Sequence, residues 1–183
     1  MAELLRGKPV ADAIIADART RSDALRARGI APTLAVVRVG SDPRDLSYER
    51  TLLKRAADAG VAVQTVSLDA DVSQDVLGVV MRALSDDPAV HGCLMFRPLP
   101  AHLDDAAACE LIAPAKDVDG VTRASLASVL AGAGEGFAPS TAEACLRVLD
   151  HYGVEIRGAR AAVLGRSLVV GKPLALLLTA RDA

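Results

Sequence analysis

Apolar and polar residues alternate along this chain in two rhythms, one with the period of an α-helix and one with the period of a β-strand. Residues 9–28 repeat apolar side chains at helical spacing, with arginines and aspartates on the opposite face, which predicts an amphipathic helix that Gly29 ends. Residues 32–40 are a short β-branched run closed by Gly40, a pattern typical of a buried parallel strand.

The same succession recurs twice more before the middle of the chain. Helical spacing returns in residues 41–60 and 73–87, and strand patterns return in residues 61–68 and 90–96. We expect Asp45 or Ser47 to cap the first of these helices, because both side chains can accept hydrogen bonds from helix N–H groups. Strands separated by helices predict a parallel sheet with right-handed crossovers. Ligands bind beyond the carboxyl ends of such strands, which here are residues 40–43 and 96–100.

The last third of the chain predicts the opening of a second α/β unit. The pattern there is a Gly-rich linker, a helix, a strand and a further helix, over residues 131–141, 140–153, 160–165 and 172–180. A doubly wound nucleotide-binding domain needs several such units and on the order of 100 residues or more, whereas little sequence follows Pro139. We predict domains at residues 1–135 and 136–183, the second incomplete, so that the natural chain is either longer than this sequence or a shortened form.

Composition and charge exclude several classes of protein. Apolar residues make up 51% of the chain and charged residues 24%, which argues against disorder. The formal net charge is −2 with acids and bases interleaved, so there is no basic stripe for nucleic acid. The charged N-terminus lacks an apolar leader, and no run approaches the roughly 18 apolar residues of a membrane span. We expect a cytoplasmic protein with no membrane or nucleic-acid partner.

Cysteine and histidine spacing predicts no metal site. The residues concerned are Cys93, Cys109, Cys145, His91, His102 and His151. The cysteines are odd in number and widely separated, and the histidines lack the i, i+4 spacing of a metal-binding helix. We interpret all six as structural or surface residues.

A glycine-containing loop is the first candidate binding site. Gly165 directly follows the predicted strand, and Gly171 precedes a predicted helix. N–H groups at a helix start attract phosphate, and Arg166 with Ser167 would hold an additional phosphate. The spacing is not Gly-x-Gly-x-x-Gly, so an ordinary strand-turn-helix connection remains the alternative.

Three further stretches each allow a functional and a structural interpretation. In the loop "PAKDVDGV", one carboxylate would accept paired N–H donors from a heterocycle, or Asp117 and Asp119 would only bond local backbone. Residues 97–103 contain two prolines, which make either a stiff pocket wall or a strand stop. Tyr48 either covers the sheet or presents its phenol to a flat ligand.

Together these stretches resemble a known family of folate enzymes. "GSDPRDLSY", "HGCLMFRPLP", "PAKDVDG", "FAPST" and "VLGRSLVVGKPLALLL" are similar, in order and spacing, to blocks of the bifunctional methylenetetrahydrofolate dehydrogenase and methenyltetrahydrofolate cyclohydrolase family. The resemblance implies an N-terminal parallel-sheet α/β domain that binds folate and performs catalysis, followed by the start of a Rossmann-like NADP-binding domain. It also implies hydride transfer from methylenetetrahydrofolate to NADP, hydrolysis of the methenyl product to 10-formyltetrahydrofolate, and a homodimer.

The resemblance also assigns roles to individual residues. Tyr48 and Asp119 match residues of the catalytic folate site, where Tyr48 lines the site and Asp119 holds the pterin. Pro98 and Leu99 match the wall of that site. The NADP loop is matched by Thr141, Gly165, Arg166, Ser167 and Gly171.

Two polar members of the family site are replaced here. The family pattern is Tyr-x-x-x-Lys, whose lysine acts in proton transfer and water activation, but this chain has Leu52 in that place. Reading "GCLMFRPLP" against the family's "GILVQLPLP" puts Phe96 where a glutamine tunes the lysine. The double change is coherent, since removing only the lysine would leave a buried amide unpaired at about 1 to 3 kcal/mol.

No other base replaces the missing lysine. Lys54 lies about 240° further round the helix than Tyr48, and Arg97 points to the opposite strand face from Phe96. Elsewhere, Ser125, Ala127 and Ala142 also depart from the family pattern. We therefore expect hydrolysis to be strongly impaired while hydride transfer persists. The alternatives are a non-catalytic folate- or nucleotide-binding paralogue and, more remotely, an assembly partner that uses the fold only as an interface.

Overall fold

A computed structural model describes residues 4–183, which divide into two compact units. Unit 1 contains the N-terminal residues up to Ala13 together with Asp117–Ala183, and unit 2 contains Ile14–Lys116. Helix α1 (Gly7–Ala27) begins in unit 1 and ends in unit 2. The domain boundary predicted at residues 135–136 falls inside unit 1 and stays a prediction.

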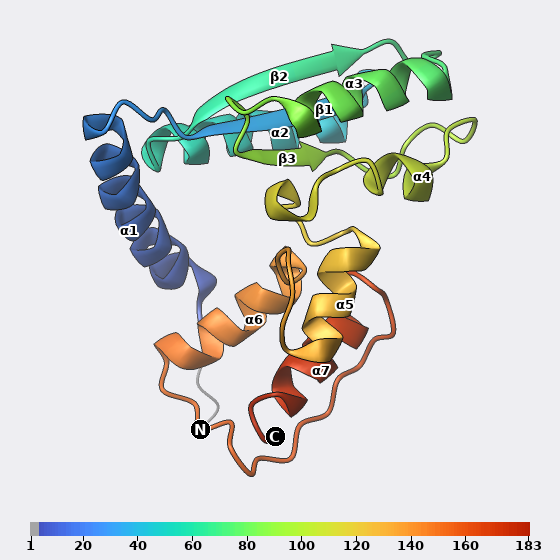
Figure 1. The fold of residues 1–183 in the computed structure, drawn as a ribbon. Helices are drawn as coiled ribbons and strands as arrows, with labels where there is room; N and C mark the ends of the chain where they lie inside the picture. Colours follow the sequence, from blue (N-terminus) through green and yellow to red (C-terminus); the bar gives the residue numbers. More distant parts are fainter. Residues whose placement is uncertain (1–3) are drawn as a thin grey trace. The chain divides into compact units, whose positions relative to one another are not determined.

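Unit 2 is a three-stranded parallel sheet with helical crossovers, as the succession of patterns predicted. Its regular elements after α1 are β1 (Thr33–Val39), α2 (Pro43–Asp58), β2 (Ala62–Leu68), α3 (Gln74–Asp86), β3 (Gly92–Met95), α4 (Asp105–Cys109) and the 3-10 turn η1 (Pro114–Lys116). The strand order is β2-β1-β3, and β1 pairs in parallel with both neighbours. Helices α2 and α3 lie on opposite faces of the sheet (Figure 1), as right-handed crossovers to opposite sides of β1 require.

The core of unit 2 centres on β1 and α3. Ala35, Val36 and Val37 of the central strand are completely buried, and so are Leu77 and Met81 of α3. The edge strand β2 instead alternates between half-buried and exposed positions. The continuous apolar run of β1 and the alternation of β2 therefore reflect a central strand covered on both faces and an edge strand.

Helix α2 begins earlier than its sequence suggested. Its cap is Asp42, whose carboxylate accepts the Arg44 N–H at 2.8 Å, so the prediction of Asp45 or Ser47 was wrong. Pro43 decides the start, because a proline lacks an N–H and has the φ of a first helical residue. The Arg44 side chain also bonds Asp42 and lowers the pKa of that carboxyl. This stabilisation is present above the ordinary aspartate pKa and is lost as the pH falls through the lowered value.

Unit 1 is held together by helices. It contains helices α5 (Arg123–Ala131), α6 (Ser140–His151) and α7 (Gly171–Thr179). Helices α6 and α7 confirm the helices predicted at residues 140–153 and 172–180. Leu146, Ile156 and Leu178 form a small core, against which Leu149, Val163, Leu174 and Leu177 pack.

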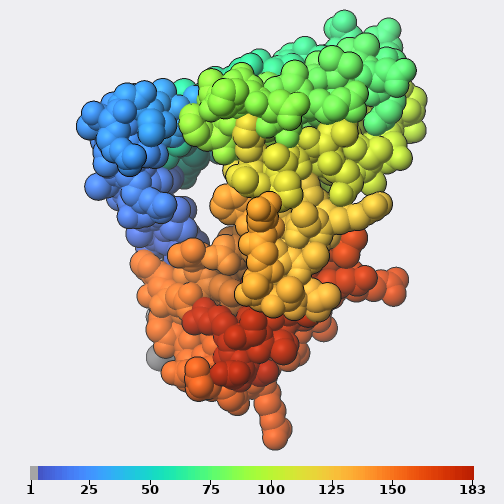
Figure 2. Space-filling model, viewed as in Figure 1, coloured from blue at the N-terminus to red at the C-terminus, as the bar shows by residue number. Residues whose placement is uncertain are grey.

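The strand predicted at residues 160–165 is absent, so that prediction was wrong. The segment has no regular structure, and Leu164 is fully exposed. Orange-red atoms of the region after α6 project from the surface of unit 1 in Figure 2. A strand needs a neighbour to accept its N–H groups and to donate to its carbonyls, and the described residues of unit 1 contain no strand that could pair with it.

Within residues 4–183, no helix combines the length and the apolar character needed to cross a bilayer.

Candidate functional site

Tyr48 projects from the first half of α2 and is 58% exposed. Its ring meets the ring of Phe96 edge to face, with centroids 5.4 Å apart and an interplanar angle of 65°. Phe96 follows β3, and its N–H donates to the Val37 carbonyl at 2.9 Å, which extends the pairing with β1. Such a ring pair contributes about 0.5 to 1.5 kcal/mol. The Tyr48 ring is thus exposed and held in place by its contact with Phe96. It is not buried against the sheet.

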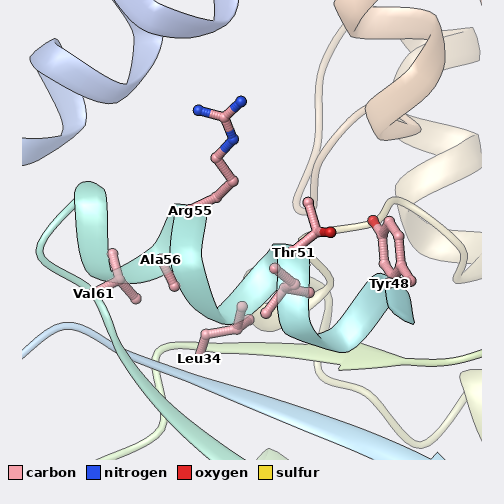
Figure 3. A pocket seen from close by; sticks show the side chains of 7 residues that line it. Leu34, Tyr48, Thr51, Arg55, Ala56 and Val61 are labelled. Atoms are coloured by element: carbon pink, nitrogen blue, oxygen red, sulfur yellow. The ribbon is translucent and has the colours of Figure 1, made fainter. Parts of the chain in front are cut away.

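A groove of about 360 Å³ runs beside Tyr48 and is almost wholly apolar. Figure 3 shows the side chains that line it. The groove is lined by Leu34, Tyr48, Thr51, Leu52, Arg55, Ala56 and Val61, all in unit 2. Leu52 lies one helical turn after Tyr48, where the family pattern has its lysine. Hydrocarbon therefore lines the groove at that position, and none of its lining residues is a carboxylate, histidine or lysine.

The loop after β3 is fixed by side chains from neighbouring segments of unit 2. The Leu99 N–H donates to Asp105 Oδ1 at 2.9 Å, and the His102 ring bonds the Val72 carbonyl at 2.9 Å. Leu99 is buried, whereas Pro98 is exposed. Of the two residues predicted to form the wall of the site, only Pro98 is therefore accessible to a ligand. Leu99 holds the loop in place through its buried side chain and its bond to Asp105.

An ion pair beside Tyr48 was not foreseen from the sequence. Arg38 Nε lies 2.7 Å from Glu49 Oε2, and the two side chains are only 10% and 12% exposed. The guanidinium also donates to Ser67 Oγ at 2.8 Å and to the Gly40 carbonyl. Arg38 thus ties β1 to β2, to the β1–α2 loop and to α2. The available signal was a lone arginine in an otherwise apolar strand.

Removing either partner of this pair is expected to destabilise unit 2. Arg38→Leu or Glu49→Val alone leaves a nearly buried charge unpaired and should lower the free energy of unfolding by about 3 kcal/mol. The double variant Arg38→Leu with Glu49→Val should recover most of this loss, because apolar residues of similar volume replace the pair. Urea titrations of the three variants measure the effect; a double variant as unstable as the sum of the singles would contradict it.

The two aspartates of the "KDVDG" loop have different surroundings in unit 1. Asp117 is fully buried and accepts bonds from Val121 N at 3.0 Å, Thr122 N at 2.8 Å and Ser125 Oγ at 2.6 Å. Asp119 is partly exposed, and its Oδ1 accepts a bond from Ser140 Oγ at 2.6 Å. The structural interpretation therefore fits Asp117, while Asp119 keeps a second carboxylate oxygen without a partner in the described part of the chain.

Two motifs that are distant in sequence meet at Gly120. This residue has φ +66°, and an added Cβ would lie 2.5 Å from Pro139 N and 2.7 Å from the Phe137 carbonyl oxygen. The "KDVDG" loop is therefore in close contact with the backbone of "FAPST". Thr141 follows in the first turn of α6 and is exposed. Sequence reading identified both motifs but not their contact.

The predicted NADP loop is a tight turn into α7. An added Cβ on Gly171 would lie 2.3 Å from both the carbonyl carbon and oxygen of Gly165. Ser167 Oγ accepts the Val170 N–H at 3.1 Å and the Gly171 N–H at 3.4 Å, so this hydroxyl helps to cap the helix start. Arg166 is exposed, and its guanidinium has no acidic partner among the described residues. The backbone cradle and a free cation fit a phosphate group.

The two glycines of this turn should differ in their tolerance of a side chain. Gly171→Ala places a methyl group against the Gly165 backbone and should lower stability by about 1 to 3 kcal/mol. Gly165→Ala is the matched control, because its Cβ would find nothing closer than Gly171 Cα at 3.8 Å. Thermal unfolding of both variants measures the difference, and equal losses would contradict the assigned contact.

In residues 4–183, no three histidine, cysteine, aspartate or glutamate side chains gather as a metal-binding group. Cys93 and Cys109 are buried and Cys145 is partly buried. The cysteines therefore add no catalytic group to the groove beside Tyr48, to the "KDVDG" loop or to the loop of Gly165 and Gly171.

The family of the chain follows from comparison with known sequences. Residues 5–119 match the family model of the tetrahydrofolate dehydrogenase/cyclohydrolase catalytic domain, and residues 139–183 match the model of that family's NAD(P)-binding domain. The chain belongs to the tetrahydrofolate dehydrogenase/cyclohydrolase family.

Individual relatives agree with this assignment. Bifunctional protein FolD 1 of Desulfitobacterium hafniense is 42% identical over 183 residues, which cover 100% of this chain and 65% of the relative. The crystal structure of the bifunctional enzyme FolD from Campylobacter jejuni superposes with a TM-score of 0.96 at 30% identity and covers 99% of this chain and 64% of that one. A Trypanosoma brucei FolD complexed with NADP cofactor and inhibitor has a TM-score of 0.91 at 33% identity, covering 100% of this chain and 62% of that one. The chain thus spans a little under two thirds of the length of these relatives.

Proposed function

We propose that this protein takes part in folate-dependent one-carbon metabolism as a methylenetetrahydrofolate dehydrogenase that uses NADP, with strongly impaired cyclohydrolase activity. Family membership supports the reaction class. The observation that carries the finer proposal is the apolar groove beside Tyr48, which Leu52 lines where the family pattern has a lysine.

The two activities make different demands on this groove. NADP, when bound, accepts a hydride from the methylene carbon, and the resulting cation is shared by the two nitrogens that flank this carbon. This step needs the two carbons held close together but no side-chain base. Hydrolysis needs a group that activates water. Leu52 and Phe96 cannot accept a proton, so the exposed Tyr48 phenol is the only acid or base besides Arg55 among the groove residues.

The residues of the two loops have distinct roles in this proposal. Asp119 accepts N–H donors of the pterin through its unbonded oxygen, and Pro98 offers an apolar surface to the folate. The cradle of Gly165 and Gly171 admits the cofactor phosphates to the start of α7, where Thr141 and Ser167 supply hydroxyl groups. Arg166 binds the additional phosphate that distinguishes NADP from NAD.

A spectrophotometric assay tests the proposal directly. Methylenetetrahydrofolate and NADP are incubated with this chain and with any longer natural form, and NADPH formation is followed together with methenyltetrahydrofolate hydrolysis. We expect NADPH formation with slow hydrolysis. Hydrolysis at the rate of a typical family member would contradict the finer proposal.

Loss of both the lysine and the glutamine favours a second candidate, a non-catalytic folate- or nucleotide-binding paralogue. Folate binding without NADPH formation in every form of the chain would support it. We further propose a cytoplasmic homodimer, in line with the expectation for the family. Sedimentation equilibrium measures the oligomeric state.

A further inference from the structure

The end of the groove opposite Tyr48 carries a cation that the proposed reaction does not use. Arg55 lies seven residues after Tyr48 on α2, which corresponds to a rise of about 10 Å, or two helical turns. Figure 3 shows both side chains projecting from the side of α2 away from the strands, with Thr51 between them. Tyr48, Thr51 and Arg55 therefore form one face of the helix beside the apolar groove.

Within the described residues, the Arg55 guanidinium has no hydrogen-bonded or ionic partner, in contrast to two other exposed arginines of unit 2. Arg19 pairs with Asp23, and Arg44 pairs with Asp42. The Thr51 hydroxyl bonds the Ser47 carbonyl within the helix, so it does not compete for Arg55. A structural role for Arg55 is to complement the helix dipole in the last turn. The helix dipole explains why the last turn of α2 contains a basic residue. It does not explain why this residue lies at the edge of the apolar groove.

We propose that Arg55 binds a carboxylate of the glutamyl tail of a folate whose ring lies against Tyr48. This inference rests on the proposed function. A folate consists of a flat pterin, an apolar aminobenzoyl ring and a glutamate with two carboxylates. The groove offers the same succession of an aromatic ring, an apolar lining and a guanidinium, whose fork suits a carboxylate. Arg55 thereby contributes to recognition of the tail and takes no part in hydride transfer.

Isothermal titration calorimetry with two ligands tests the inference. The probes are 5-formyltetrahydrofolate and 5-formyltetrahydropteroate as its uncharged benzamide, so that only the folate carries the glutamyl carboxylates. Arg55→Ala should weaken binding of the folate roughly threefold to tenfold and leave binding of the pteroate unchanged. Arg55→Lys should retain part of the affinity, and added salt should reduce the difference between the two ligands.

Arg50→Ala is the matched control, because Arg50 is an exposed arginine of the same helix about 140° away from Arg55 around its axis. It should bind both ligands as the unchanged chain does. Equal weakening of both ligands by Arg55→Ala, or no weakening of either, would overturn the inference and leave the proposed function intact. If the unchanged chain binds neither ligand, the proposed function fails and the inference fails with it.

Discussion

Asp117→Ala is expected to lower the free energy of unfolding by at least about 3 kcal/mol. The fully buried carboxylate accepts two backbone N–H groups and the Ser125 hydroxyl, and each donor left unpaired costs about 1 to 3 kcal/mol. Asp117→Asn should also destabilise, because its amide NH₂ would meet donors rather than acceptors. Denaturant titration followed by circular dichroism measures both losses.

Asp119, two residues later, is the matched comparison for this prediction. Asp119→Ala removes one exposed bond to Ser140 and should change stability by less than about 1 kcal/mol. The same substitution should abolish measurable binding of a reduced folate, whereas the Asp117 variants fail by unfolding. A stable Asp117→Ala protein, or an Asp119→Ala protein that binds folate normally, would overturn the division of roles between the two carboxylates.

The fold of unit 2 was predictable because its signals are local. Residues 34–37 of β1 form a continuous apolar run, since helices cover this strand on both faces, and the helical patterns of α1 and α3 are amphipathic over several turns. The wrong cap of α2 arose from weighing cap propensity without the constraint that Pro43 imposes. Such errors of a few residues at element ends leave the topology unchanged.

The strand predicted at residues 160–165 failed for a different reason. Its composition suits a strand, but a strand forms only when another strand satisfies its backbone groups. Helix formation at α7 needs no such partner, since its hydrogen bonds are made within the helix. Sequence therefore predicted the helix after the glycine loop correctly and the strand before it incorrectly.

Resemblance supplied the motifs of the candidate site, and the roles of their residues stay predictions. The contacts within the site could not be predicted from the sequence. The contact between Gly120 and the "FAPST" backbone, and the burial of Asp117 next to the partly exposed Asp119, follow from packing between distant segments. The pairing of Arg38 with Glu49 likewise depends on how α2 lies over β1. The edge-to-face contact between Phe96 and Tyr48 is another result of this packing.

Leu52→Lys combined with Phe96→Gln is expected to raise methenyltetrahydrofolate hydrolysis by roughly a hundredfold, since positioned general acid–base groups contribute on the order of 10² to 10⁴. Leu52→Lys alone places an ammonium in an apolar groove with no carboxylate or side-chain amide to orient it. Phe96→Gln alone buries an amide where the ring is now 6% exposed and removes the edge contact with Tyr48. Each single change should therefore gain little and lose some stability.

The double variant should exceed the combined effect of the two single changes, because the amide and the ammonium then satisfy each other. Decay of the methenyl absorbance, corrected for the uncatalysed reaction, gives the four rates of the cycle. Leu52→Lys with Phe96→Leu is the control, since it supplies the ammonium without the amide and should stay near the single variant. Strict additivity of the two activation free energies would show that positions 52 and 96 do not act as a pair, and that Phe96 serves only to hold the Tyr48 ring.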